Sequence, residues 1–246
     1  MRISTELALA ALALAACKET SATDPDAPAI DATAVVDAST PDASPDATVA
    51  SDARPDAGPG TPDIVLVESE MVNTWTVSSE FFGADSCELI EGCIGAQGNR
   101  RLLRFDTVTA NMGTADLVMG PVPPAGVSTD VYVWSECHHH HHVTGYADYQ
   151  LLGPGGVVAS GHKQAFCLED IERLSATAAD NPRFTCDSQG IQAGWADVYN
   201  GGLPCQWIDV TGVPPGQYTL KIAVNPSQQI VESNYDNDTL LIDVVL

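Results

Sequence analysis

Short apolar segments alternate with turn-forming residues along the chain from Asp63 onward. The segments are rich in β-branched and aromatic residues, and Gly, Pro and Asn separate them, which is the pattern of an all-β protein. No segment has the periodicity of a long amphipathic helix. We expect strands at residues 64–68, 73–81, 101–106, 115–119, 131–134, 147–152, 157–160, 205–210, 218–224 and 239–246.

Residues 63–246 are expected to form a single β-rich, loop-rich domain, because their number lies within the range of one hydrophobic core. Two long connections, 172–182 and 190–204, are rich in turn-forming residues. Long connections usually run over the surface of a domain and often carry function. We therefore expect both to lie on the surface or over a site.

Residues 1–16 have the pattern of an export signal. A single arginine precedes the apolar run 7–14, which is too short to span a bilayer as a helix. The run ends in Leu-Ala-Ala-Cys17, which resembles the lipobox of bacterial lipoproteins. The alternative is an ordinary cleavable signal followed by an incidental cysteine. We expect an exported protein that is anchored to the cell envelope through a lipid on Cys17, with its domain facing the periplasm or the cell exterior.

Residues 17–62 consist largely of Asp-Ala and Pro-Asp-Ala units, with no aromatic residue and few large apolar ones. Such a segment buries too little apolar surface to offset the entropy lost on ordering. We expect a disordered acidic tether that is stiffened by proline and holds the domain away from a membrane surface.

The chain is strongly acidic, with a formal net charge of −23, and 23 of its 33 acidic residues follow residue 62. Such a charge argues against nucleic-acid binding, which requires a basic surface. It would attract cationic small molecules or basic polypeptides. It would equally serve only to keep an exported domain soluble.

Six cysteines follow Cys17, and an even number in an exported domain indicates disulfides. The loop from Cys87 to Cys93 is short enough to close on itself. The spacing does not decide how Cys137, Cys167, Cys186 and Cys205 pair. Zinc binding by cysteine is less favoured, because no close cysteine pair has the usual ligand spacing.

Five of the six histidines lie in one run, residues 138–142. If this segment is extended, His138, His140 and His142 project to one side and the other two histidines to the opposite side. Three imidazoles on one face can bind one metal ion, and the residue types alone permit copper, zinc, nickel or iron. The alternatives are an internal polyhistidine tag and an accidental low-complexity tract. A tag normally lies at a terminus beside a linker, whereas this run directly follows the expected buried strand 131–134.

Several spaced motifs resemble those of the lysyl oxidase family, and they occur in the order found in that family. The match is close from about residue 131 to residue 238. The motifs are Trp134-x-x-Cys137-His138-x-His140-x-His142, Gly161-His162-Lys163-x-x-Phe166-Cys167-Leu168-Glu169-Asp170, Arg183-Phe184-x-Cys186, Asp197-x-Tyr199, Cys205-Gln206-Trp207-Ile208-Asp209, and Val224-Asn225-Pro226 through Glu232-Ser233-x-Tyr235-x-Asn237.

The resemblance implies a copper site and a cofactor that the protein makes from its own side chains. His138, His140 and His142 would ligate Cu²⁺. Tyr199 would be oxidised at the copper, and the amine of Lys163 would add to the product to give lysine tyrosylquinone. Such a quinone offers an electrophilic carbonyl and an electron sink, neither of which an unmodified side chain provides.

The activity implied by the resemblance is oxidative deamination of primary amines, including lysine-containing substrates, to aldehydes. Dioxygen would be consumed, and hydrogen peroxide and ammonia would be released. Asp197 is the candidate base that takes a proton from the carbon next to the amine nitrogen. Glu169 and Asp170 are expected to make structural hydrogen bonds, and His162 to orient the loop beside Lys163.

Two departures from the family's pattern bear on the site. Animal members have a further histidine where this chain has Ser135. Cys167 and Cys205 have lost the neighbouring cysteines with which the resemblance would pair them. The resemblance therefore implies three bonds, Cys87 with Cys93, Cys137 with Cys186, and Cys167 with Cys205, and the last would tie the Lys163 segment to the Tyr199 segment.

A second hypothesis belongs to a different class of protein. The domain would be an exported β-rich binding module that holds copper or another metal at the three histidines without forming the quinone. The two hypotheses share the histidines and differ in Lys163 and Tyr199.

Overall fold

The computed structural model describes residues 60–161 and 167–246. The expected signal peptide 1–16, Cys17 and nearly all of the tether 17–62 lie outside the described residues, and so does Lys163. Within the described part the regular secondary structure is almost entirely strand, as predicted, with two four-residue helices, α1 (Glu68–Met71) and α2 (Cys87–Ile90). No helix in this part is long and apolar enough to cross a membrane.

The strands are short and all of their pairings are antiparallel. They are β1 (Ile64–Leu66), β2 (Thr76–Phe82), β3 (Gly98–Arg104), β4 (Thr107–Asn111), β5 (Leu117–Val118), β6 (Tyr132–Ser135), β7 (His140–Val143), β8 (Ala147–Gly153), β9 (Gly156–Ser160), β10 (Glu172–Arg173), β11 (Gly190–Ile191), β12 (Trp195–Tyr199), β13 (Trp207–Asp209), β14 (Gln217–Val224) and β15 (Thr239–Val245).

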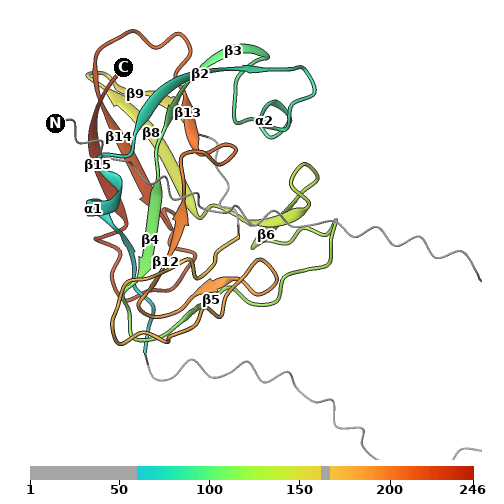
Figure 1. Ribbon diagram of the computed structural model, residues 1–246, viewed down its shortest axis with the longest axis vertical. Helices are drawn as coiled ribbons and strands as arrows, with labels where there is room; N and C mark the ends of the chain where they lie inside the picture. The colour runs from blue at the N-terminus through green and yellow to red at the C-terminus, as the bar shows by residue number, and fades with distance from the viewer. Residues whose placement is uncertain (1–59, 162–166) are drawn as a thin grey trace, which may run out of the picture. The chain divides into compact units, whose positions relative to one another are not determined.

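Two four-stranded sheets, with strand orders β1-β4-β12-β10 and β15-β14-β8-β9, form the body of the domain (Figure 1). A three-stranded sheet, β13-β3-β2, and the two-stranded pairs β5/β11 and β6/β7 complete it. The main hydrophobic core draws on both four-stranded sheets, including Val108 and Ala110 of β4 and Leu220 and Ile222 of β14. In β15, buried and exposed residues alternate, because one face of this strand meets the core and the other meets solvent.

β4 lies in the middle of its sheet and is buried along its whole length, although it contains Thr107, Thr109 and Asn111. Each of these polar side chains has a partner. The Tyr146 hydroxyl donates to Oγ1 of Thr109 at 2.9 Å, and the Gln206 amide donates to Oγ1 of Thr107 at 2.9 Å. Because of these polar residues, a prediction based on apolar runs missed this strand.

The connection 190–204, which we expected on the surface or over a site, does not lie on the surface. This stretch contains β12, which lies between β4 and β10 and is almost entirely buried. The acidic Asp197 in the centre of β12 led us to predict a loop, because a buried carboxylate is uncommon. The other long connection contains β10, whose two residues are exposed, in line with the expected surface position.

All three disulfides predicted from the family resemblance were wrong. The bonds are Cys87–Cys137, Cys93–Cys205 and Cys167–Cys186, with Cα–Cα distances of 5.6, 5.3 and 4.9 Å. Cys87 and Cys93 do not close a short loop, because the chain between them forms α2 and each cysteine meets a distant partner. One bond fastens α2 to the histidine turn, one fastens the loop after α2 to the segment before β13, and the third closes the segment that follows Cys167.

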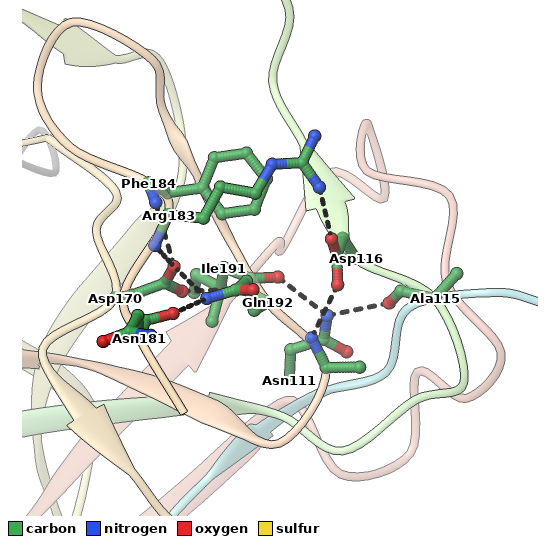
Figure 2. A network of polar contacts seen from close by, with 10 residues as sticks. Asn111, Ala115, Asp116, Asp170, Asn181, Arg183, Phe184, Ile191 and Gln192 are labelled. Carbon is green, nitrogen blue, oxygen red and sulfur yellow. Dashed lines mark hydrogen bonds and ion pairs between the residues drawn. The ribbon is translucent and has the colours of Figure 1, made fainter. Parts of the chain in front are cut away.

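Asp170 is the buried centre of a hydrogen-bond network that holds the segment from Cys167 to Gln192 (Figure 2). Its carboxylate accepts four hydrogen bonds, from the backbone N–H of Arg183, Phe184 and Gln192 and from the side-chain amide of Gln192, at 2.8–2.9 Å. Figure 2 also shows Arg183 paired with Asp116 at 2.8 Å. The sequence-based expectation that Asp170 makes structural hydrogen bonds is confirmed.

Replacing Asp170 with Ala is expected to lower the free energy of unfolding by at least about 3 kcal/mol, because several buried N–H donors lose their acceptor together. Urea unfolding measures the change. The control is Asp187→Ala, an exposed carboxylate in the same segment, which should change the free energy by less than about 0.5 kcal/mol. Equal effects of the two substitutions would contradict the role given to Asp170.

Candidate metal centre and buried tyrosine

The histidine run lies on a β-hairpin formed by β6 and β7, in which Ser135 pairs with His140 and Trp134 with His141. Ligand atoms of His138, His140 and His142 lie within 4.8 Å of one another. The extended conformation expected for the whole run was only partly correct. His140 and His142 alternate on β7, whereas His138 lies in the turn before it.

The turn is what brings His138 to the other two histidines. His139 has a φ of 55°, in the left-handed region, and this reverses the chain between His138 and β7. His139 itself is exposed. His141 is buried against Trp134, and its Nε2 lies 2.9 Å from the carbonyl oxygen of Val127. Neither belongs to the three-histidine group.

The donor set fits a transition metal. Nε2 of His140 and Nε2 of His142 are 3.1 Å apart, a separation expected of two ligands that each bind one ion at about 2.0–2.1 Å. Imidazole nitrogen suits copper as well as zinc, nickel and iron. The half-buried position of the group limits access of solvent to a bound ion.

Asp197 and Tyr199 are two residues apart on β12, so their side chains project from the same face of the sheet. Both are buried, with 2% and 3% of their surface exposed. Burial away from water raises the pKa of Asp197 to about 7, although the nearby Tyr199 hydroxyl acts in the opposite direction. Oδ2 of Asp197 is buried and accepts no hydrogen bond from the residues that the structure describes. It can therefore take up a proton.

The Tyr199 hydroxyl donates a hydrogen bond to the carbonyl oxygen of Cys167 at 3.2 Å. Burial, followed by the charge of Asp197, raises the pKa of Tyr199 well above its ordinary value, so the hydroxyl stays protonated. Lys163 and His162 lie outside the described residues. The tyrosine hydroxyl thus contacts a residue, Cys167, that is only four positions after Lys163 in the sequence.

Gln189 connects the tyrosine side of the site with the histidine hairpin. Its Oε1 accepts a hydrogen bond from the backbone N–H of Leu168 at 3.1 Å, and its Nε2 donates to the carbonyl oxygen of His141 at 3.2 Å. Its side chain is fully buried. Sequence reasoning missed Gln189, and also Glu91, whose carboxylate reaches His138. Neither lies in a motif, so only the folded arrangement reveals them.

Comparisons with known proteins agree with the motifs. A family model described as lysyl oxidase matches residues 72–246. Lysyl oxidase homolog 3 of Homo sapiens is 38% identical over 167 residues, which cover 63% of this chain and 21% of the human protein. Lysyl oxidase homolog 2 of Gallus gallus is 35% identical over 189 residues, which cover 73% of this chain and 24% of the chicken protein. The chain therefore spans about a fifth to a quarter of the length of these relatives.

The raised pKa of Asp197 should make the metal-free protein less stable as the pH rises. The carboxyl has a pKa of about 3.9 in the unfolded chain and about 7 in the folded protein. Its stabilising contribution is therefore complete below about pH 4 and is lost as the pH rises through about 7. Asp197→Asn cannot ionise, so its melting temperature should exceed that of the wild type by several degrees at about pH 8 and by much less at about pH 5.

Thermal unfolding of both proteins across this pH range measures the difference. Asp243→Asn, which alters an exposed carboxylate on β15, serves as the control and should show no such growth with pH. If the melting temperatures of Asp197→Asn and wild type differed by the same amount at both ends of the pH range, the raised pKa of Asp197 would be contradicted.

Proposed function

The chain belongs to the lysyl oxidase family, and from this premise we propose that it is a copper-dependent amine oxidase. It would convert primary amines, including lysine-containing substrates, to aldehydes with dioxygen, releasing hydrogen peroxide and ammonia. The observation that carries the proposal is the presence, in one domain, of three convergent histidine nitrogens and a buried tyrosine whose hydroxyl is bound to Cys167, four residues after Lys163 in the sequence.

His138, His140 and His142 would hold the copper ion through ring nitrogens. When bound, copper would promote oxidation of Tyr199 by dioxygen to a quinone, to which the amine of Lys163 would add to give lysine tyrosylquinone. The protein's part is to place the two side chains. The hydroxyl of Tyr199 is bound to Cys167, four residues after Lys163 in the sequence. Gln189 connects the next residue, Leu168, to His141 of the hairpin.

Asp197 is the proposed catalytic base. A base that works near neutral pH needs a pKa in that range, and burial raises the pKa of this carboxyl to about 7. Its side chain projects from β12 on the same face as Tyr199. It would therefore accept the proton removed from the carbon next to the substrate nitrogen, at a carboxylate oxygen that is otherwise unoccupied by hydrogen bonds from the described residues.

The proposal extends to the location of the protein. Export and lipidation at Cys17 would place the domain outside the cytoplasm, attached to a membrane only through the lipid. Three disulfides in the domain are consistent with an oxidising compartment. The net charge of −23 favours cationic amines as substrates.

Lys163→Ala is expected to abolish amine-dependent release of hydrogen peroxide while copper remains bound, because the histidines are unchanged. His140→Ala should lose both copper and activity. Peroxide release from a primary amine and copper content of the purified full-length protein measure the two effects. Lys221→Ala removes the only other lysine after residue 62 and should behave like wild type. Full activity of Lys163→Ala, or copper-loaded wild type that releases no peroxide with any primary amine tried, would contradict the proposal.

A further inference from the structure

Glu91 lies against the metal centre although it is 47 positions from His138 in the sequence. It follows helix α2 directly as its C-terminal cap. The disulfide Cys87–Cys137 joins the first residue of α2 to the residue immediately before His138, and Figure 1 shows α2 and β6 on the same side of the domain. This bond places the carboxylate of Glu91 beside the histidine turn.

Oε2 of Glu91 is 3.1 Å from Nε2 of His138, which is the distance of an ion pair. The two side chains are 22% and 13% exposed, so water screens their interaction only partly. Arg, Lys and other histidines form no ion pair with Glu91 within the described residues. His138 is therefore the side chain with which Glu91 interacts at the metal centre.

Ser135 fixes both members of this pair. Its hydroxyl donates a short hydrogen bond to Oε1 of Glu91, and its oxygen accepts a hydrogen bond from the backbone N–H of His138 at 3.0 Å. Ser135 is buried, with 5% of its surface exposed. Each oxygen of the Glu91 carboxylate thus has a separate partner, which leaves the carboxylate a single orientation toward His138.

We propose that Glu91 is a positioning residue of the metal centre, which acts through His138 and is itself held by Ser135. The inference rests on the proposed copper site. A carboxylate beside a ligating histidine fixes the orientation of the ring and raises the basicity of its nitrogen, and removing such a partner typically weakens metal binding by about 10–100-fold. In this proposal Glu91 acts on His138, and the ligand group is the three convergent histidines.

The assignment gives Ser135 a function in this chain. At this position, where the resemblance leads one to expect a histidine, the hydroxyl serves as both donor and acceptor. An alanine here would leave Oε1 of Glu91 and the N–H of His138 without this partner. Replacing Ser135 should therefore weaken copper binding, as replacing Glu91 does. The loss should be smaller, because the contact between Glu91 and His138 remains.

Copper affinity of the full-length protein, measured by competition with a chelator of known affinity, tests the proposal. Glu91→Gln keeps the size of the side chain and removes its charge, and it should weaken Cu²⁺ binding by about 10–100-fold. Glu91→Asp should recover part of the loss, and Ser135→Ala should show a smaller loss. Glu88→Gln alters a carboxylate of the same helix that makes no ion pair within the described residues, and it should bind copper like wild type.

A double-mutant cycle with His138→Ala distinguishes action through the histidine from direct ligation. If Glu91 acts through His138, adding Glu91→Gln to His138→Ala should cause little further loss. Thermal unfolding of the metal-free variants confirms that each is folded, and Ser135→Ala provides an independent reading should Glu91→Gln not fold.

Copper affinity of Glu91→Gln equal to that of wild type would overturn the inference and leave the proposed function standing. A full further loss in the double variant would also overturn it, since Glu91 would then bind metal without His138. Wild type that binds no copper would overturn the proposed function together with the inference.

Discussion

The candidate site depends on one buried carboxylate, that of Asp170, which organises the segment between Cys167 and Gln192. An unpaired charge in this position would be costly, and four N–H donors from three residues, Arg183, Phe184 and Gln192, satisfy it. Because both ends of the segment are fixed in this way, Cys167 presents its carbonyl to Tyr199 and Gln189 reaches the histidine hairpin. The two halves of the site therefore share one structural support.

The histidine hairpin is held from two directions. On one side Gln189 accepts from Leu168 and donates to His141, which links the hairpin to the tyrosine. On the other side the disulfide Cys87–Cys137 joins the hairpin to α2 and places Glu91 beside His138. A metal centre held by rigid neighbours keeps its ligands close to the geometry that the ion requires. The histidines alone do not explain the site, because their positions depend on residues far away in the sequence.

Sequence patterns predicted the all-β class, most strands and the family, because these depend on local alternation and on motifs in a fixed order. They failed where a tertiary partner changes the meaning of a residue. From sequence alone, Asp197 indicates a loop, because acidic residues are rarely buried. The surrounding core and Tyr199 explain its burial only in the folded protein, and β12 was missed for this reason. The turn at His139 and the three disulfide pairings depend on how distant segments meet, which neither spacing nor resemblance decided correctly for this chain.

The central proposal is that Lys163 and the buried Tyr199 react to form one cofactor. Peptide mapping by mass spectrometry, performed on protein purified without copper and again after loading with copper in air, tests this claim directly. The account predicts separate Lys163 and Tyr199 peptides before loading, and a covalently linked pair that stains as a quinone afterwards. Unmodified Lys163 and Tyr199 peptides in fully copper-loaded protein would contradict it.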